Sequence, residues 1–176
     1  MAENCTLGKV MISEEQIRQR VKELGKQITE DYKGKEVLFI GILRGAVLFM
    51  SDLIREVDLD ARIDFMAVTS YGASTKSSGV VRILKDLDSD IEGMDVIIVE
   101  DIVDSGTTLH YLRDYLLGRK PKSLKICAFL DKPERREADI RADYVGFEVE
   151  NKFIVGYGLD YDGKYRNLPY ITCLEE

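Results

Sequence analysis

Three acidic residues lie close together between an apolar run and a stretch of small hydroxyl residues. The apolar run is Val96-Ile-Ile-Val99, the acids are Glu100, Asp101 and Asp104, and Ser105-Gly-Thr-Thr108 follows. The run predicts a buried strand, and the hydroxyl segment predicts the first turn of a helix. Because ligands bind beyond the carboxyl ends of strands in open parallel sheets, these side chains are expected at a binding edge.

The hydroxyl segment suits a phosphate group. A helix N-terminus presents free N–H groups and a partial positive charge, and a glycine at Gly106 lets the backbone approach closely. Carboxylates repel phosphate, but they accept hydrogen bonds from sugar hydroxyls and hold Mg²⁺ through water. A simple capped turn explains Ser105 and Gly106, but it does not explain Glu100 and Asp101, since uncompensated charge at the end of a buried strand is costly. The segment therefore predicts a site for a phosphorylated sugar.

Several classes of site are excluded by what the chain lacks. It contains neither G-x-x-x-x-G-K-[ST] nor G-x-G-x-x-G, which removes P-loop nucleotidases and disfavours Rossmann dehydrogenases. One histidine, His110, and three scattered cysteines leave no set of ligands for a zinc site, so oxygen atoms must hold any metal. With 25 Lys and Arg against 32 Asp and Glu, the net charge of −7 disfavours a general nucleic-acid binder.

The elements that must position these residues follow from periodicity. Ser13 and Gln16 form a capping box, and apolar residues at helical spacing predict a helix over 14–30. Buried strands are predicted at 37–43, 95–100 and 124–130, helices at 46–56 and 107–118, and further strands at 61–71, 80–84, 144–149 and 153–157. This alternation predicts an α/β fold with a central parallel sheet.

Size and composition predict one compact unit. A chain of 176 residues with 45% hydrophobic residues can build one core, so residues 1–176 are expected to form a single domain. The longest apolar stretch, residues 37–50, is interrupted by Arg44 and is shorter than the roughly 20 residues of a membrane span. Residues 1–6 show no secretory signal, so a cytoplasmic location is expected. The small polar residues of 72–79 predict a mobile loop.

The segment from Glu100 to Thr108 resembles the phosphoribosyl pyrophosphate motif of the type I phosphoribosyltransferases. Four further segments resemble, in the same order, the members of that family that act on hypoxanthine and guanine: 42–45, 69–71, 131–132 and 145–166. The resemblance implies a central parallel sheet flanked by helices, a small hood formed by terminal segments and a flexible lid loop. It also implies purine salvage, Mg²⁺ as cofactor, small-molecule substrates with no nucleic-acid or membrane partner, and a homodimer or homotetramer.

The resemblance gives roles to the acidic cluster and the hydroxyl segment. Glu100 and Asp101 match the pair that binds the ribose hydroxyls and supports Mg²⁺. Asp104 matches the carboxylate beside purine N7, the proposed general base. The loop that binds the 5′-phosphate is matched by Asp104, Ser105, Gly106, Thr107 and Thr108.

The pyrophosphate contacts and the lid come from other segments by the same resemblance. Arg44 and Gly45 match the pyrophosphate loop, in which the peptide bond before Arg44 is expected to be cis. Arg166 matches a further pyrophosphate contact. Ser70 and Tyr71 match the start of the lid, which closes over the reaction.

The purine site is also assigned by resemblance. Lys132 matches the lysine that donates to the 6-oxo group, and Phe153 matches the ring that stacks on the base. Ile154 matches the backbone that reads the base edge, and Asp160 matches a second carboxylate that reaches Mg²⁺ through water near the base. Without the resemblance, Lys132 would be interpreted as a solvated surface lysine and Phe153 as a core residue.

Two other functional classes stay open. One is a regulator of the same fold that senses phosphoribosyl pyrophosphate and binds nucleic acid; the net charge of −7 disfavours it without excluding a local basic patch. The other is a sister transferase with a different acceptor base, such as adenine or orotate. Relatives that use adenine tend to carry a small residue at the position of Asp104, so Asp104 together with Lys132 favours a 6-oxopurine.

Overall fold

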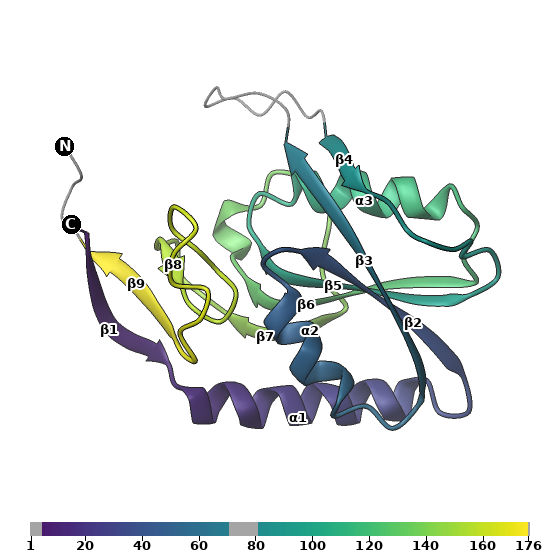
Figure 1. Cartoon of the computed structure of the whole chain (residues 1–176), viewed down its shortest axis with the longest axis horizontal. Coiled ribbons are helices and arrows are strands. Elements are labelled where there is room, and N and C mark those ends of the chain that lie inside the picture. Colours follow the sequence, from purple (N-terminus) through teal and green to yellow (C-terminus); the bar gives the residue numbers. More distant parts are fainter. Residues whose placement is uncertain (1–4, 71–80, 176) are drawn as a thin grey trace.

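A six-stranded sheet forms the body of the protein, whose computed structural model describes residues 5–70 and 81–175 (Figure 1). The strand order is β4-β3-β2-β5-β6-β7. The strands are β2 (Glu36–Leu43), β3 (Asp60–Ser70), β4 (Val81–Lys85), β5 (Asp95–Val103), β6 (Ser123–Asp131) and β7 (Tyr144–Glu148). All neighbours are parallel except β4, which pairs antiparallel with β3 at the edge. The predicted α/β fold with a central parallel sheet is confirmed.

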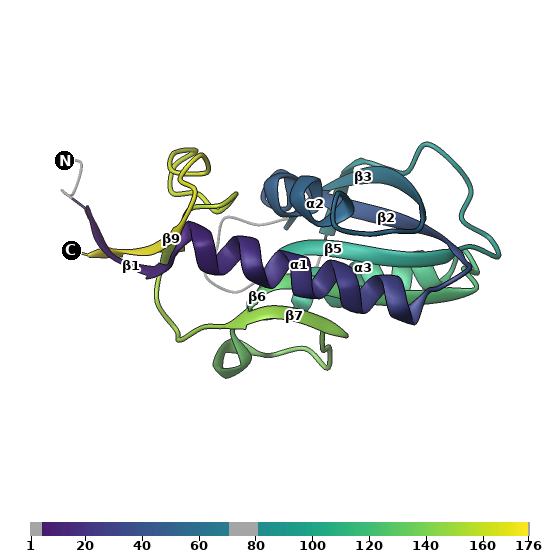
Figure 2. The same cartoon turned by 90° about the horizontal axis from the view of Figure 1, so that it is seen from below.

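Helices cover both faces of this sheet. Figure 2 shows α1 (Glu14–Asp31) and α2 (Val47–Ile54) on one face and α3 (Thr107–Leu117) on the other. The predicted capping box starts α1, since the Ser13 hydroxyl accepts the Gln16 N–H and the Gln16 side chain accepts the Ser13 N–H. Each face has its own apolar core, which contains Leu24 and Phe49 on the first side and Leu112 on the second. No helix in the described ranges is long and apolar enough to cross a membrane.

A second, three-stranded antiparallel sheet forms a hood beside the carboxyl ends of the parallel strands (Figure 1). It joins β1 (Thr6–Ile12), β9 (Ile171–Glu175) and β8 (Ile154–Val155). The hood expected from the resemblance is therefore present and uses both terminal segments. Periodicity alone does not predict β1, because six of its seven residues are exposed or half-buried in no regular alternation and only Ile12 is buried. The strand predicted over 153–157 is shorter in the structure, covering only β8.

Candidate active site

β5 carries the two adjacent carboxylates inside the sheet. The strand extends to Val103, three residues beyond its predicted end, so Glu100 and Asp101 are strand residues. Ile97 and Val99 pack in the core beside α1 and α2, and alternation along a strand places Asp101 on that same face. The Glu100 carboxylate accepts the Asp101 N–H at 3.1 Å, and the Asp101 carboxylate accepts the Ile102 N–H at 2.7 Å.

The surroundings of this pair disfavour two negative charges. Burial raises the pKa of Glu100 well above its usual range, and the neighbouring Asp101 charge raises it further. Burial also raises the pKa of Asp101, although hydrogen bonds and the Arg166 charge act in the opposite direction. In the described part of the chain, no group of three His, Cys, Asp or Glu residues could hold a metal alone. A cation at this pair would therefore need further oxygen atoms from a ligand or water.

Replacing Glu100 by Gln is expected to stabilise the protein when it is free of ligand and Mg²⁺. A raised pKa means that the fold disfavours the ionised form, so the penalty is absent below the ordinary value of 4.5 and grows as the pH rises above it. Glu100→Gln should therefore raise the melting temperature at pH 8, by roughly 2–4 °C per kcal/mol of repulsion removed. The gain should shrink at pH 5. Thermal melts at the two pH values check this, and a gain that is larger at pH 5 contradicts it.

The hydroxyl segment forms a tight bend before α3. Gly106 has a φ of 81°, and a Cβ at this position would lie 2.6 Å from Ile140 Cγ2 and 2.9 Å from Arg136 Cδ. Only glycine fits this conformation and this space. The N-cap residue of α3, Gly106, has no side chain to cap the helix, and the Ser105 carbonyl is held by the N–H groups of residues 137 and 138 at 2.9 and 3.1 Å. The Thr107 N–H donates to the Ser105 hydroxyl at a long 3.4 Å, which a phosphate oxygen could replace at this end of the helix.

Asp104 stands between the bend and two arginines. Arg135 Nε donates to the Asp104 carboxylate at 3.0 Å, and both side chains are about half exposed. Arg136 Nε donates to the Asp104 carbonyl at 3.2 Å and also pairs with the buried Asp131. The sequence pattern gives no reason to single out either arginine. Only their position could indicate a role, because both closely follow the end of β6, which neighbours β5.

The segment after β2 meets Asp101 directly. The peptide bond between Leu43 and Arg44 is cis, as expected, and Arg44 is exposed. A Cβ on Gly45 would overlap the Asp101 carboxylate, lying 2.6 Å from its Cγ. Glycine therefore lets the segment after β2 lie against the end of β5, and the structure brings these two predicted site segments together.

The hood loop, residues 156–166, packs on the same segment. Gly158 has a φ of 99°, and a Cβ there would lie 3.2 Å from the carbonyl carbon of Gly45. Arg166 donates to the Gly158 carbonyl at 2.5 Å and pairs with Asp160 at 3.0 Å. The second Asp160 oxygen accepts the Gly163 N–H at 2.8 Å. Asp160 and Arg166 thus lie in one loop that reaches the Arg44–Gly45 segment, a contact that sequence reasoning missed.

The residues predicted to contact the purine base lie at the end of β6 and in the adjoining hood. Lys132 is only 7% exposed and donates to the Lys152 carbonyl at 2.6 Å, so it is not a solvated surface lysine. Burial lowers the pKa of Lys132, and the Asp104 charge opposes this shift. Phe153 is 55% exposed and meets the Tyr161 ring edge-on at 5.6 Å. An exposed aromatic ring is free to stack on a ligand, whereas a core residue is not.

Ile154 lies in β8 with its side chain buried, so only its backbone is available to a ligand. Tyr71 and the loop 72–79 lie outside the described residues, as does the side chain of Ser70. β4 covers most of the strand predicted over 80–84 and pairs antiparallel with β3.

Comparison with known proteins agrees with this arrangement. The family model for the phosphoribosyl transferase domain matches residues 12–162, most of the chain. The chain belongs to the phosphoribosyltransferase family. As a phosphoribosyltransferase it is an enzyme of the transferase class, and its matched region contains β5, the bend before α3 and most of the hood loop.

Relatives of this phosphoribosyltransferase include the hypoxanthine-guanine phosphoribosyltransferase of Bacillus subtilis, which is 57% identical over 96% of this chain and 94% of its own length. A crystal structure of a hypoxanthine phosphoribosyltransferase from Staphylococcus aureus superposes with a TM-score of 0.94 at 53% identity, covering 96% of this chain and 92% of that one. A hypoxanthine-guanine phosphoribosyltransferase from Bacillus anthracis gives a TM-score of 0.92 at 48% identity, covering 98% of this chain and 100% of that one. The type I fold expected from the sequence is confirmed.

Proposed function

We propose that the chain transfers a 5-phosphoribosyl group from phosphoribosyl pyrophosphate to N9 of hypoxanthine or guanine, releasing pyrophosphate. The observation that carries the proposal is the adjacent carboxylate pair, Glu100 and Asp101, beside the uncapped N-terminus of α3. The names of relatives at 52–57% identity supply the class of base, since they are hypoxanthine-guanine phosphoribosyltransferases. The reaction is a step of purine salvage.

The sugar donor is proposed to lie along the ends of β5 and β2. Glu100 and Asp101 accept hydrogen bonds from the ribose hydroxyls. The 5′-phosphate is bound by N–H and hydroxyl groups of Ser105, Gly106, Thr107 and Thr108. Arg44, Gly45 and Arg166 contact the pyrophosphate, where two guanidinium groups neutralise the charge that grows on the leaving group.

Magnesium fits the donor set of this site. Glu100 and Asp101 offer hard oxygen ligands, and because burial raises the pKa of both carboxyls, a bound cation would stabilise their ionised forms. Asp160 is proposed as a second carboxylate that reaches the ion through water. When bound, Mg²⁺ neutralises charge on the pyrophosphate oxygens.

The base is proposed to lie between the end of β6 and the hood. Lys132 donates to the 6-oxo group, the Phe153 ring stacks on the purine, and the Ile154 backbone reads its edge. Asp104 takes the proton from N7 while N9 forms its bond to C1′ of the ribose and the bond from C1′ to pyrophosphate breaks. Ser70 and Tyr71 are proposed to begin a lid that excludes water, which would otherwise hydrolyse the donor.

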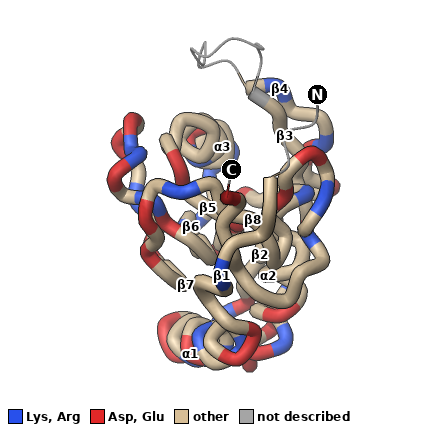
Figure 3. The backbone as a smooth tube through the Cα atoms, turned by 90° about the vertical axis from the view of Figure 1, so that its left-hand side faces the viewer, with Lys and Arg blue, Asp and Glu red and all other residues tan. Residues whose placement is uncertain are grey.

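Other properties stay predictions of the same proposal. Residues 1–176 act as one domain in a homodimer or homotetramer, the location is cytoplasmic, and neither nucleic acid nor a membrane is a partner. Against the nucleic-acid regulator, Lys and Arg positions are interspersed with Asp and Glu positions on the side of the molecule in Figure 3. A net charge of −7 supports the same choice, because a nucleic-acid binder needs a concentrated basic surface.

Lys132→Met should weaken the binding of the purine base without weakening the binding of the sugar donor. The substitution keeps most of the buried side-chain volume but removes the ammonium group, which donates a hydrogen bond in the structure. Loss of a charged donor is worth about 10–100-fold, so KM for hypoxanthine should rise by that factor while KM for phosphoribosyl pyrophosphate stays within about threefold. Lys152→Met is the control, because the exposed Lys152 side chain forms an ion pair with Glu150 at 3.0 Å on the surface. Equal increases for both substrates contradict the assignment.

Steady-state kinetics across a panel of bases tests the whole proposal. The protein is incubated with phosphoribosyl pyrophosphate, Mg²⁺ and, in turn, hypoxanthine, guanine, xanthine, adenine or orotate. Nucleotide and pyrophosphate should form with hypoxanthine and guanine. Product with adenine or orotate alone would overturn the choice of base, and binding to RNA or DNA at physiological salt without turnover would support the regulator instead.

A further inference from the structure

Tyr157 has a backbone conformation that its own residue type does not favour. Its φ is 46°, and the flanking Gly156 and Gly158 have φ values of 105° and 99°. Glycine adopts positive φ readily, whereas a bulky residue with positive φ is uncommon. Backbone hydrogen bonds from the N–H groups of Tyr157 and Gly158 to the carbonyls of residues 168 and 166, both 2.9 Å long, hold the loop in this shape, and the Tyr157 side chain adds contacts of its own.

Two contacts fix that side chain. The Tyr157 hydroxyl donates to Asp52 on α2, and the Tyr157 ring meets the Phe129 ring edge-on with centroids 4.9 Å apart. Tyr157 is 7% exposed, and the other Asp52 oxygen pairs with Arg55 at 2.6 Å. Burial and the Asp52 carboxylate raise the pKa of the Tyr157 hydroxyl, so it stays a donor throughout the neutral range.

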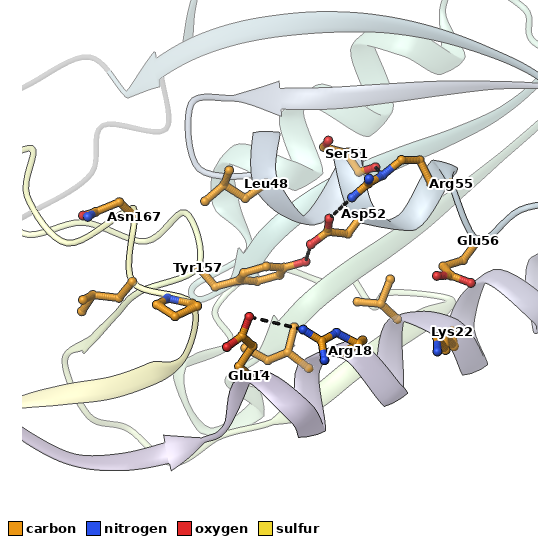
Figure 4. Close-up of a pocket in the computed structure, with 14 residues that line it drawn as sticks. Glu14, Arg18, Lys22, Leu48, Ser51, Asp52, Arg55, Glu56, Tyr157 and Asn167 are labelled. Atoms are coloured by element: carbon orange, nitrogen blue, oxygen red, sulfur yellow. Dashed lines mark hydrogen bonds and ion pairs between the residues drawn. The ribbon is translucent and has the colours of Figure 1, made fainter.

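The space beside this hydrogen bond is open. Figure 4 shows Tyr157 and Asp52 in the wall of a cavity of about 510 Å³, between α1, α2 and the segment that follows the hood loop. Arg18 and Leu48 line the same cavity. On its other side the Tyr157 ring packs against Phe129, and the hydrogen bond to Asp52 links the hood loop directly to α2.

That link joins two segments of the proposed pyrophosphate site. α2 begins at Val47, directly after the segment that contains Arg44 and Gly45. Gly158, the next residue after Tyr157, lies against the Gly45 carbonyl, and its own carbonyl accepts a hydrogen bond from Arg166 at 2.5 Å. A shift of Tyr157 would therefore move the Arg166 side of the site relative to the Arg44 side.

We propose that Tyr157 and Asp52 are positioning residues for the pyrophosphate end of the sugar donor. Their hydrogen bond sets the spacing between the hood loop and the segment after β2, so that Arg44 and Arg166 face the same group. Neither residue contacts the substrate. The inference rests on the proposed function, since it takes these two arginines as pyrophosphate contacts.

Tyr157→Phe tests this role, because it keeps the ring and removes only the hydroxyl. KM for phosphoribosyl pyrophosphate, and KM for pyrophosphate in the reverse reaction, should rise roughly tenfold, while KM for hypoxanthine stays within about twofold. Tyr144→Phe is the matched control. It removes a second buried Tyr–Asp hydrogen bond, which joins the edge strand β7 to Asp31 at the end of α1 at 2.6 Å. Melting temperature should fall in both variants, but KM should change only in Tyr157→Phe.

Changes at Asp52 make the test independent of the tyrosine. Asp52→Asn keeps an acceptor oxygen and should retain most donor affinity, whereas Asp52→Leu should match Tyr157→Phe, and the double variant should be no worse than either single one. Additive effects of the Tyr157 and Asp52 substitutions in the double variant would overturn this inference but not the proposed function. An unchanged KM for phosphoribosyl pyrophosphate in Tyr157→Phe would do the same. If the unmodified protein forms no nucleotide from hypoxanthine and phosphoribosyl pyrophosphate, the proposed function itself is overturned.

Discussion

Asp104→Asn should lower kcat by about 10²–10⁴-fold, the usual contribution of a positioned general base. The amide keeps the size of the side chain and an oxygen that can accept the Arg135 hydrogen bond, which measures 3.0 Å in the structure. It cannot take the N7 proton, so purine N9 must attack with that proton still in place. KM for phosphoribosyl pyrophosphate should stay within about threefold, because Asp104 acts on the base. Steady-state kinetics with hypoxanthine as acceptor measures both quantities.

Arg135→Met distinguishes the effect of losing the general base from the effect of losing its ion pair with Arg135. It removes the partner of Asp104 but leaves the carboxylate, and an ion pair between half-exposed groups contributes little to stability. We expect kcat of Arg135→Met to stay within about threefold of the unmodified value. Near-normal turnover in Asp104→Asn would reject Asp104 as the base. A loss in Arg135→Met as deep as that in Asp104→Asn would instead assign the effect to the ion pair.

The buried parts of the fold can be predicted because burial leaves a pattern in the sequence. β2, β5 and β6 are apolar runs within one to three residues of their observed ends, and α1 shows both its capping box and its apolar spacing. The acidic cluster and the bend before α3 can also be predicted, because they occupy one continuous segment. The continuous segment from Glu100 to Thr108 therefore contains most of the residues of the proposed sugar-donor site.

Contacts between distant segments leave no such pattern. β1 and β9 pair through backbone hydrogen bonds between the two ends of the chain. Four of the seven β1 residues are exposed, and β9 has only two buried residues at its start, so neither periodicity nor an apolar run marks these strands. The burial of Lys132 depends on the carbonyl of Lys152, twenty residues away, and on a hood built from both ends of the chain. Gly45 and Gly158 are neighbours only because β2 and the hood loop meet above the sheet. These contacts decide the geometry of the site, and the structure is needed to find them.

The closeness of these segments brings the carboxylates and the guanidinium groups of the proposed donor site together. Asp101 lies under Gly45, Gly45 lies under Gly158, and Gly158 holds Arg166. The carboxylates and the cations are thus separated by backbone rather than by side chains. In the proposed site these charged groups bind one extended ligand. A side chain at either glycine should therefore displace the segments on both sides of it.

Gly45→Ala should therefore lower kcat/KM for phosphoribosyl pyrophosphate by about 10²-fold or more, the cost of misplacing reacting groups by about 1 Å. The added Cβ would overlap a short, half-buried carboxylate, whose other oxygen already accepts the Ile102 N–H at 2.7 Å. The loop cannot retreat toward the hood either, because Gly158 lies against its carbonyl. Gly45 is not among the described glycines with positive φ, so alanine fits its backbone and the clash alone is tested.

Gly118→Ala is the matched control for this substitution. Gly118 has a φ of −62°, and the nearest atom to an added Cβ is the Tyr115 carbonyl oxygen at 3.4 Å. It lies at the end of α3 far from the carboxylates, so its kinetic constants should be unchanged. Gly45→Ala should fold, with a melting temperature close to that of the control, and should fail specifically in the use of the donor. A kcat/KM within about threefold of the unmodified value would mean that Asp101 can move aside without loss, and the proposed role of Asp101 on the ribose would then be wrong.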